Sequence, residues 1–198
     1  MEHKDFEFAV PEGYREVYHI NAADKKTGIK MTLGALAIMV VVIAVLFAFS
    51  DLKQLDLEKV MLYDVVWIAS MLVYIVLHEL VHGAVYKMLT HQKLKFGITW
   101  SAAFCGVPDI YTYRRTALLS LVAPLTVFTV ILLPLTIALR FVDMGWYLVC
   151  GLVFAIHISG CIGDMFVTSL FLKKFKDPRT LMRDNGPEQW VYEPEKAK

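Results

Sequence analysis

Four long apolar runs dominate the hydrophobic pattern of this chain. Each is at least as long as the roughly 20 residues that an α-helix needs to cross the hydrocarbon core of a membrane. Two of the runs carry no charged side chain, whereas the second and the fourth are interrupted by ionisable residues. The runs are Met31–Ser50, Val65–Tyr86, Thr116–Leu139 and Met144–Leu172. The pattern predicts an all-α membrane protein with four transmembrane helices.

The composition agrees with a membrane protein and excludes several other classes. Hydrophobic residues make up 57% of the 198 residues, against roughly 45–50% in soluble domains, which argues against a soluble all-α protein. The formal net charge of +1 gives no basic excess, so we expect no nucleic-acid partner. The three cysteines (Cys105, Cys150 and Cys161) have no CxxC spacing, which excludes a disulfide framework and a thiolate zinc knuckle.

The polar segments between the runs predict the organisation and the orientation of the chain. We expect an N-terminal segment at 1–30, a four-helix domain at 31–172 and a polar tail at 173–198. The first run starts too late and is too long for a cleaved signal peptide, so it is expected to stay as an anchor. From the N-terminus, the segments outside the runs hold 5, 2, 5, 1 and 7 Lys and Arg residues. Because basic loops stay in the cytoplasm, both termini of this multi-pass cell-membrane protein are expected there.

The second run contains the most informative motif, His78-Glu79-Leu80-Val81-His82. On a helix, the H-E-x-x-H spacing puts both imidazoles on one face, one turn apart, where they can share a metal ion. Glu79 lies about 100° further round the helix, where a general base for a metal-bound water belongs. Ionisable residues inside an apolar span are rare and usually mark function. The motif therefore predicts a zinc site, and the alternative is a pair of structural histidines beside a protonated glutamate.

A catalytic zinc of this kind needs a third protein ligand and an open fourth position. No glutamate occurs between Glu79 and Glu188. Asp164 is the strongest candidate: it lies 8 residues before the inner end of the fourth run, about 12 Å deep. The histidines of the second run lie at a similar depth. The other candidates are Asp109, Asp143, His91 and His157, of which Asp143 is expected on the far side of the membrane.

His157 lies two helical turns outward of Asp164 in the fourth run. Small or polar residues share its helical stripe, which suggests that this face packs against protein rather than lipid. We consider a catalytic role for His157, as an oxyanion donor or as a partner of the metal ligands. A purely structural hydrogen bond is an equal alternative.

The loop between the second and third runs has a strand pattern. Leu94, Phe96, Ile98 and Trp100 alternate with other residues, which is the period of a β-strand. Turn residues follow at 106–109, and 110–114 then returns, which predicts a short β-hairpin at 93–114. Such a hairpin would either pair with an extended substrate by strand addition or lie at the membrane interface, anchored by aromatic residues.

These residues also resemble a known family. His78-Glu-Leu-Val-His-Gly83, Phe96-Gly97, Ala123-Pro124 and Gly163-Asp164 are similar to segments of the bacterial putative zincin peptidases, small four-helix membrane proteins related in plan to site-2 proteases. The resemblance implies intramembrane zinc proteolysis with Glu79 as base and with His78, His82 and Asp164 as ligands. One feature departs from site-2 proteases, which carry an asparagine near the ligand aspartate: the only asparagines here are Asn21 and Asn185.

Together these features predict an integral membrane zinc metalloprotease. Its substrates would be membrane-associated polypeptides, its surroundings the lipid bilayer, and its cofactor Zn²⁺. The sequence carries no signal for an oligomeric state. The alternatives are a non-enzymatic, zinc-containing membrane scaffold or assembly protein, and a small metal or proton transporter. Two runs without any ionisable residue argue against a transporter, because no relay then crosses the membrane.

Overall fold

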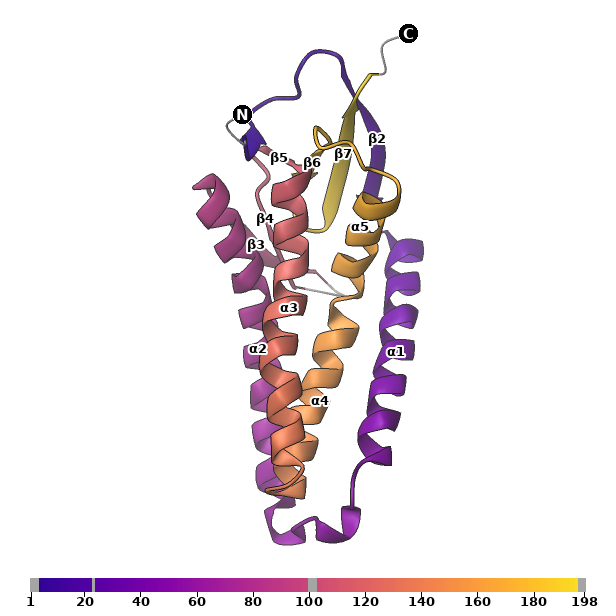
Figure 1. Ribbon diagram of the computed structural model, residues 1–198, viewed down its shortest axis with the longest axis vertical. Helices are drawn as coiled ribbons and strands as arrows, with labels where there is room; N and C mark the ends of the chain where they lie inside the picture. Colours follow the sequence, from indigo (N-terminus) through magenta and orange to yellow (C-terminus); the bar gives the residue numbers. More distant parts are fainter. Residues whose placement is uncertain (1–3, 23, 100–102, 196–198) are drawn as a thin grey trace. The chain divides into compact units, whose positions relative to one another are not determined.

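A computed structural model describes residues 4–22, 24–99 and 103–195 (Figure 1). Its long helices are α1 (Lys25–Ala48), α2 (Val60–Thr90), α3 (Arg114–Leu139), α4 (Met144–Gly160) and α5 (Ile162–Lys173). Two single 3-10 turns, η1 (Leu52–Gln54) and η2 (Leu57–Lys59), join α1 to α2. The strands are β1 (Phe6–Glu7), β2 (Tyr14–Asn21), β3 (Lys95–Ile98), β4 (Ala103–Gly106), β5 (Tyr111–Tyr113), β6 (Leu181–Asp184) and β7 (Glu188–Pro194).

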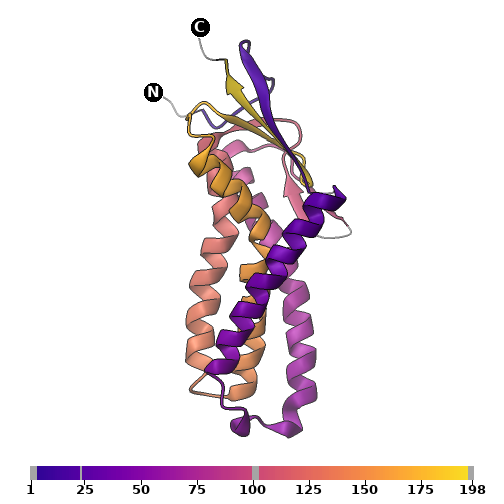
Figure 2. The same cartoon turned by 90° about the vertical axis from the view of Figure 1, so that its right-hand side faces the viewer.

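The strands overturn the expectation of an all-α protein. The chain is a mixed α/β protein, 62% helical and 17% strand, because both terminal segments take part in a β-sheet. This sheet is antiparallel, has five strands and follows the order β1-β5-β6-β7-β2. Its outer strand β2 pairs with β7 from the other end of the chain, and the two lie side by side in both ribbon views (Figures 1 and 2). The prediction was wrong because these strands find their partners far away in sequence.

The loop between α2 and α3 contains a hairpin, but its second strand is not the expected segment 110–114. β3 pairs with β4 as a separate two-stranded sheet. The return segment after the turn at 106–109 becomes β5, which joins the five-stranded sheet instead. Trp100 and Ser101, expected at the end of the first hairpin strand, lie outside the described residues.

The chain divides into two compact units. Unit 1 comprises residues 1–30, 78–124 and 163–198, and unit 2 comprises residues 31–77 and 125–162. In unit 1 the start of α3 and residues of α5 pack against the five-stranded sheet. Their shared core consists of Ile20, Ala117, Leu121, Val167, Phe171, Phe175, Met182 and Val191.

One arginine ties the start of α3 to the end of α5. The Arg114 guanidinium, at the start of α3, donates hydrogen bonds to the carbonyl oxygens of Phe171 (3.1 Å) and Phe175 (2.9 Å). These carbonyls belong to the C-terminal end of α5 and the residues after it, where a helix leaves its acceptors unpaired and favours a cation. Arg114 thus fixes the helix that carries Asp164.

Among its described residues, unit 2 has helices and connecting turns but no strand, and it packs around Leu46, Met144, Tyr147 and Ala155. Asp143 caps α4 by accepting from the Trp146 amide (3.0 Å), and it also accepts from the Tyr63 hydroxyl (3.0 Å). Tyr63 lies directly against Gly145, where an added Cβ would come within 2.1 Å of the ring. Only glycine permits this approach, so the start of α4 is held firmly against α2.

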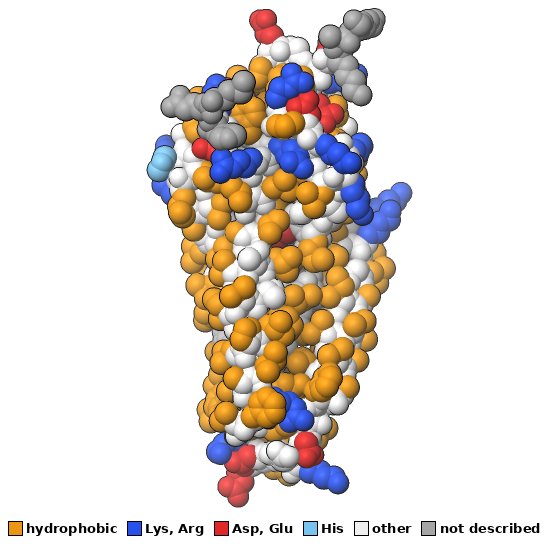
Figure 3. All heavy atoms as spheres, viewed as in Figure 1, with side chains coloured by type: hydrophobic (Ala, Val, Ile, Leu, Met, Phe, Trp, Pro, Cys, Tyr) orange, Lys and Arg blue, Asp and Glu red, His pale blue; other side chains and the backbone are white. Residues whose placement is uncertain are grey.

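The helices have the length and surface of membrane spans. Three of them (α1, α2 with the preceding turn, and α3) are long and apolar enough to cross a membrane, and α4 with α5 gives a fourth if this pair, broken at Cys161, is one span. Hydrophobic side chains gather over the helices in the space-filling view (Figure 3). Exposed ones in unit 2 include Val40, Val45, Val130 and Ile131. This surface is compatible with a membrane protein.

Candidate metal centre

Two histidines of α2 face the interior of unit 1. His78 and His82 are each only 8% exposed, and their ring centroids lie 5.0 Å apart. The helix continues to Thr90 and ends where His91 takes a positive φ of 56°. Lys87 donates to the carbonyls of His91 and Gln92 there, which satisfies acceptors at the helix end.

Asp164 lies in the first turn of α5 and points at both imidazoles. Its Oδ2 atom is 3.3 Å from His78 Nε2 and 3.4 Å from His82 Nε2. A carboxylate in the first turn of a helix is favoured by the positive end of the helix dipole. The three side chains therefore present three donor atoms to one point in unit 1.

The spacing of these donors fits a zinc ion. Zinc binds His nitrogen and carboxylate oxygen at about 2.0–2.2 Å in tetrahedral geometry, so neighbouring ligand atoms should lie roughly 3.3–3.5 Å apart. The two distances to Asp164 match this value. Two imidazoles and one carboxylate are also a donor set of catalytic zinc sites, which leave the fourth position for water.

A backbone contact gives His82 the tautomer that a metal ligand needs. Its Nδ1 atom lies 2.9 Å from the carbonyl oxygen of Ser120 on α3. Because a carbonyl only accepts hydrogen bonds, Nδ1 carries a proton, which leaves Nε2, on the side of Asp164, as the ring nitrogen available to a metal ion. Metal-binding histidines usually make such a second contact, which fixes the ring orientation.

Glu79 is half-buried next to this cluster. Its carboxylate interacts electrostatically with His78, His82 and Asp164, and it accepts a hydrogen bond from the backbone amide of Cys105 on β4. The Cys105 side chain itself is a poor ligand, because burial raises the pKa of its thiol to about 12. A carboxylate held beside the cluster, but not among the three converging donors, is placed as a proton acceptor would be.

Comparison with protein families gives one match. The sequence model of a family described as putative zincin peptidase matches residues 71–178, more than half of the chain. The chain belongs to this family. Neither the curated proteins nor the solved structures gave a match. Membership of the zincin peptidase family suggests a metallopeptidase and implies a zinc cofactor.

The other candidate ligands are not among the three converging donors. Asp109 and His91 are exposed. Asp143 caps α4 in unit 2 and accepts from Tyr63.

His157 has its own hydrogen-bond partners. It belongs to unit 2, where it is fully buried. Its Nδ1 atom lies 3.0 Å from the Tyr74 hydroxyl, and its Nε2 atom lies 3.0 Å from the Thr129 hydroxyl. Both ring nitrogens thus lie at hydrogen-bond distance from hydroxyls, as buried polar groups usually do, and a catalytic role for His157 stays a prediction.

A buried pair that sequence reasoning missed lies one helical turn beyond His82. The Tyr86 hydroxyl donates to Asp184 Oδ2 (2.8 Å), and both residues are almost fully buried. Burial raises the pKa of Asp184 to about 6, although hydrogen bonds from Gly186 and Tyr86 oppose this shift. The i, i+4 spacing from His82 could have pointed to Tyr86, but nothing in the sequence marks Asp184 as its partner.

The turn between β6 and β7 also fixes the segment that contacts Glu79. The Asp184 carbonyl accepts from the Val107 amide (2.9 Å), and its Oδ1 accepts from the Gly186 amide (2.8 Å). A Cβ at Gly106 would come within 2.6 Å of the Gly186 nitrogen. The C-terminal hairpin, which lies beyond the family match, therefore holds the end of β4 in place beside the site.

Proposed function

We propose that this zincin peptidase is an integral membrane enzyme that hydrolyses peptide bonds of membrane-associated polypeptides. In this proposal His78, His82 and Asp164 hold the zinc ion, and Glu79 is the general base. The observation that carries the proposal is the approach of the Asp164 carboxylate to both Nε2 atoms, at 3.3 and 3.4 Å.

The roles of the residues follow from their chemistry. Zinc would supply Lewis acidity towards water and towards the carbonyl of the scissile peptide. Glu79 would accept a proton from the attacking water as its oxygen bonds to the carbonyl carbon. The same carboxyl group would then pass the proton to the amine as the C–N bond breaks, so that water is divided between the two products. The Cys105 amide, by donating to Glu79, would keep the carboxylate oriented.

The sheet supports the orientation inferred from the positive charges. β1 and β2 precede α1, β5 lies between α2 and α3, and β6 and β7 follow α5. Strands of one sheet must lie on the same side of a membrane. In a chain that spans the membrane, an even number of crossings therefore separates β2 from β5 and β5 from β7. This supports four crossings, with α4 and α5 as one broken span and both termini on one side of the membrane, and the basic residues favour the cytoplasm as that side.

The hairpin offers a place for an extended substrate. Among the described residues, β4 pairs only with β3. The Cys105 amide points to Glu79, so this amide lies on the edge of β4 that faces away from β3. An extended polypeptide along that edge would add a strand to the hairpin and bring its own peptide bonds close to Glu79. Because helices shield their peptide bonds, such a segment would have to be unwound locally.

The decisive experiment combines metal analysis with a test of turnover. Purified protein would be analysed for zinc in the wild type and in the His82→Ala and Asp164→Ala variants. We expect about one zinc per wild-type chain and a fall in affinity of about 100-fold or more when one of three ligands is lost. His91→Ala and Asp109→Ala remove the same side chains from exposed positions and should leave the zinc content unchanged.

Turnover would be followed by mapping new N-termini in membranes from cells that express either the wild type or Glu79→Gln. The variant should keep its zinc and lose cleavage, because only the proton acceptor is removed. Wild-type membranes without any Glu79-dependent cleavage, but with zinc bound, would contradict the enzymatic proposal and favour a scaffold. Full zinc binding by Asp164→Ala would contradict the ligand set.

A further inference from the structure

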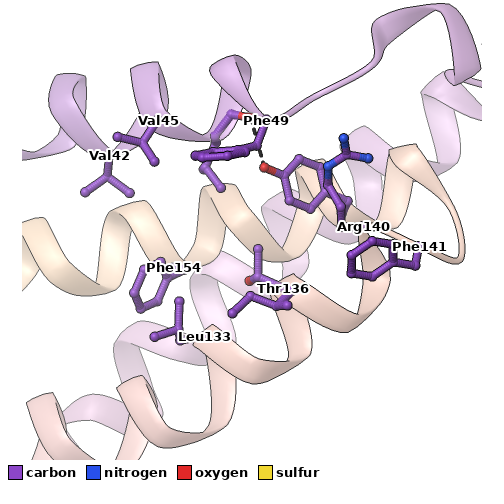
Figure 4. Close-up of a pocket in the computed structure, with 11 residues that line it drawn as sticks. Val42, Val45, Phe49, Leu133, Thr136, Arg140, Phe141 and Phe154 are labelled. Atoms are coloured by element: carbon purple, nitrogen blue, oxygen red, sulfur yellow. Dashed lines mark hydrogen bonds between the residues drawn. The ribbon is translucent and has the colours of Figure 1, made fainter.

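Unit 2 contains an apolar groove between α1, α3 and α4. Its volume is about 380 Å³, within the range of small-molecule sites. Figure 4 shows Val42 and Val45 of α1 opposite Leu133 and Thr136 of α3. Phe154 lies towards one end of the groove, and Arg140 lies with Phe141 towards the other. The groove is a concave site that the zinc centre does not use.

The floor of the groove leaves no hydroxyl for an occupant. Leu46, Thr136 and Tyr147 form the buried floor, and the two hydroxyls point into the protein. The Tyr147 hydroxyl donates to the Leu46 carbonyl (2.9 Å), and the Thr136 hydroxyl donates to the Leu132 carbonyl (2.7 Å). Apart from Arg140 at one end, an occupant therefore meets apolar surface along the groove and must itself be apolar there.

Arg140 is the one charged residue that lines the groove. It lies directly after the end of α3, and its guanidinium carbon is 5.9 Å from the centre of the Tyr147 ring. Within the described residues the guanidinium forms no ion pair. The groove thus combines a long apolar surface with a single cation at one end of the membrane-spanning helices, where lipid headgroups lie.

We propose that this groove binds one acyl chain of an anionic phospholipid, with the phosphate beside the Arg140 guanidinium. The apolar chain matches the groove, and the phosphate gives Arg140 the planar, bidentate partner that guanidinium groups favour. The groove is too small for a membrane helix of about 20 residues. The proposal requires only that the helices span the membrane and is independent of peptidase activity.

The test is native mass spectrometry of the full-length protein in detergent. Phosphatidylglycerol and phosphatidylcholine with identical acyl chains would be titrated separately, and the adduct with one lipid would be measured. We expect about a fivefold preference for phosphatidylglycerol, as one cation near an anionic headgroup typically provides. Arg140→Gln should abolish the preference, whereas Lys53→Gln, an exposed lysine after α1 that does not line the groove, should keep it.

A second pair of variants tests the groove itself. Val45→Trp should fill it and reduce the phosphatidylglycerol adduct severalfold. Val41→Trp is the matched control, because Val41 is exposed on the same helix one turn earlier and does not line the groove. Ile137→Trp fills the groove from α3 and should repeat the result if Val45→Trp does not fold.

Three results would overturn the proposal. The first is equal binding of the two lipids by the wild type, which is the behaviour of a non-specific lipid shell. The second is an unchanged preference in Arg140→Gln. The third is a groove-dependent adduct with the mass of a peptide rather than a phospholipid.

Discussion

Replacing Asp184 by asparagine should remove the pH dependence of stability that this buried carboxyl group imposes. Asparagine has the shape of a protonated aspartic acid. Its carbonyl oxygen can keep the hydrogen bond from the Gly186 amide, and its amide group can donate to the Tyr86 hydroxyl. The substitution therefore removes the charge but preserves the packing of the β6–β7 turn.

The expected size follows from the pKa. In the folded protein the pKa of Asp184 rises from 3.8 to about 6, a difference of about 2 units or about 3 kcal/mol. Between about pH 4 and pH 6 the folded state binds more protons than the unfolded state, so stability falls as the pH rises through this window. Above pH 6 both states are ionised and the loss is complete. Relative to the wild type, Asp184→Asn should therefore gain about 3 kcal/mol between pH 4 and pH 7.

Thermal unfolding in detergent at a series of pH values would measure this gain. For a chain of this length, a gain of about 3 kcal/mol corresponds to roughly 6–12 °C. The melting temperature of Asp184→Asn, relative to that of the wild type, should rise by this amount between pH 4 and pH 7. Glu193→Gln, which removes a partly exposed carboxyl group from β7 of the same sheet, controls for the loss of a charge. Parallel curves for wild type and Asp184→Asn from pH 4 to pH 7 would refute the reasoning.

Two further predictions concern unit 2. Gly145→Ala should destabilise the protein by about 1–3 kcal/mol in thermal unfolding, because the new Cβ would overlap the Tyr63 ring; Gly160→Ala, at a helical glycine with open space around it, should not, and equal effects would contradict this account. His157→Ala should lower stability by about 1–3 kcal/mol, because it leaves the buried hydroxyl of Tyr74 and the half-buried hydroxyl of Thr129 without this partner. Its zinc content should stay at the wild-type level, and a loss of zinc without a loss of stability would instead favour a role at the metal.

The sequence was informative where short-range periodicity was enough. The spacing of His78 and His82 predicts a shared helical face without any knowledge of the rest of the chain. Asp164 is distant in sequence, but its depth in the fourth apolar run can be compared with the depth of His78 and His82 in the second. In the structure its carboxylate lies beside both imidazole rings. The role of the three residues as zinc ligands stays a prediction.

The sheet could not be predicted in the same way. A bulge in β2 between Glu16 and Tyr18 breaks the alternation that would mark a strand. In β6 the neighbouring residues Leu181 and Met182 are both buried, which again hides the period of two. With these strands hidden, the contact between Tyr86 and Asp184 was hidden too, because the sheet is what brings the C-terminal segment to α2.

The pairing of β2 with β7 has a consequence for biosynthesis. β2 leaves the ribosome before the long helices α1 to α5, whereas its partner β7 follows them. β2 must therefore wait, unpaired with β7, until these helices have been made, and such long-range pairing is intrinsically slow. Asp184 arrives equally late, so the segment beside Glu79 acquires its support only after the helices have been made. A peptidase with this order of elements would remain immature until β7 is in place, which would delay cleavage of neighbouring proteins while its helices are being made.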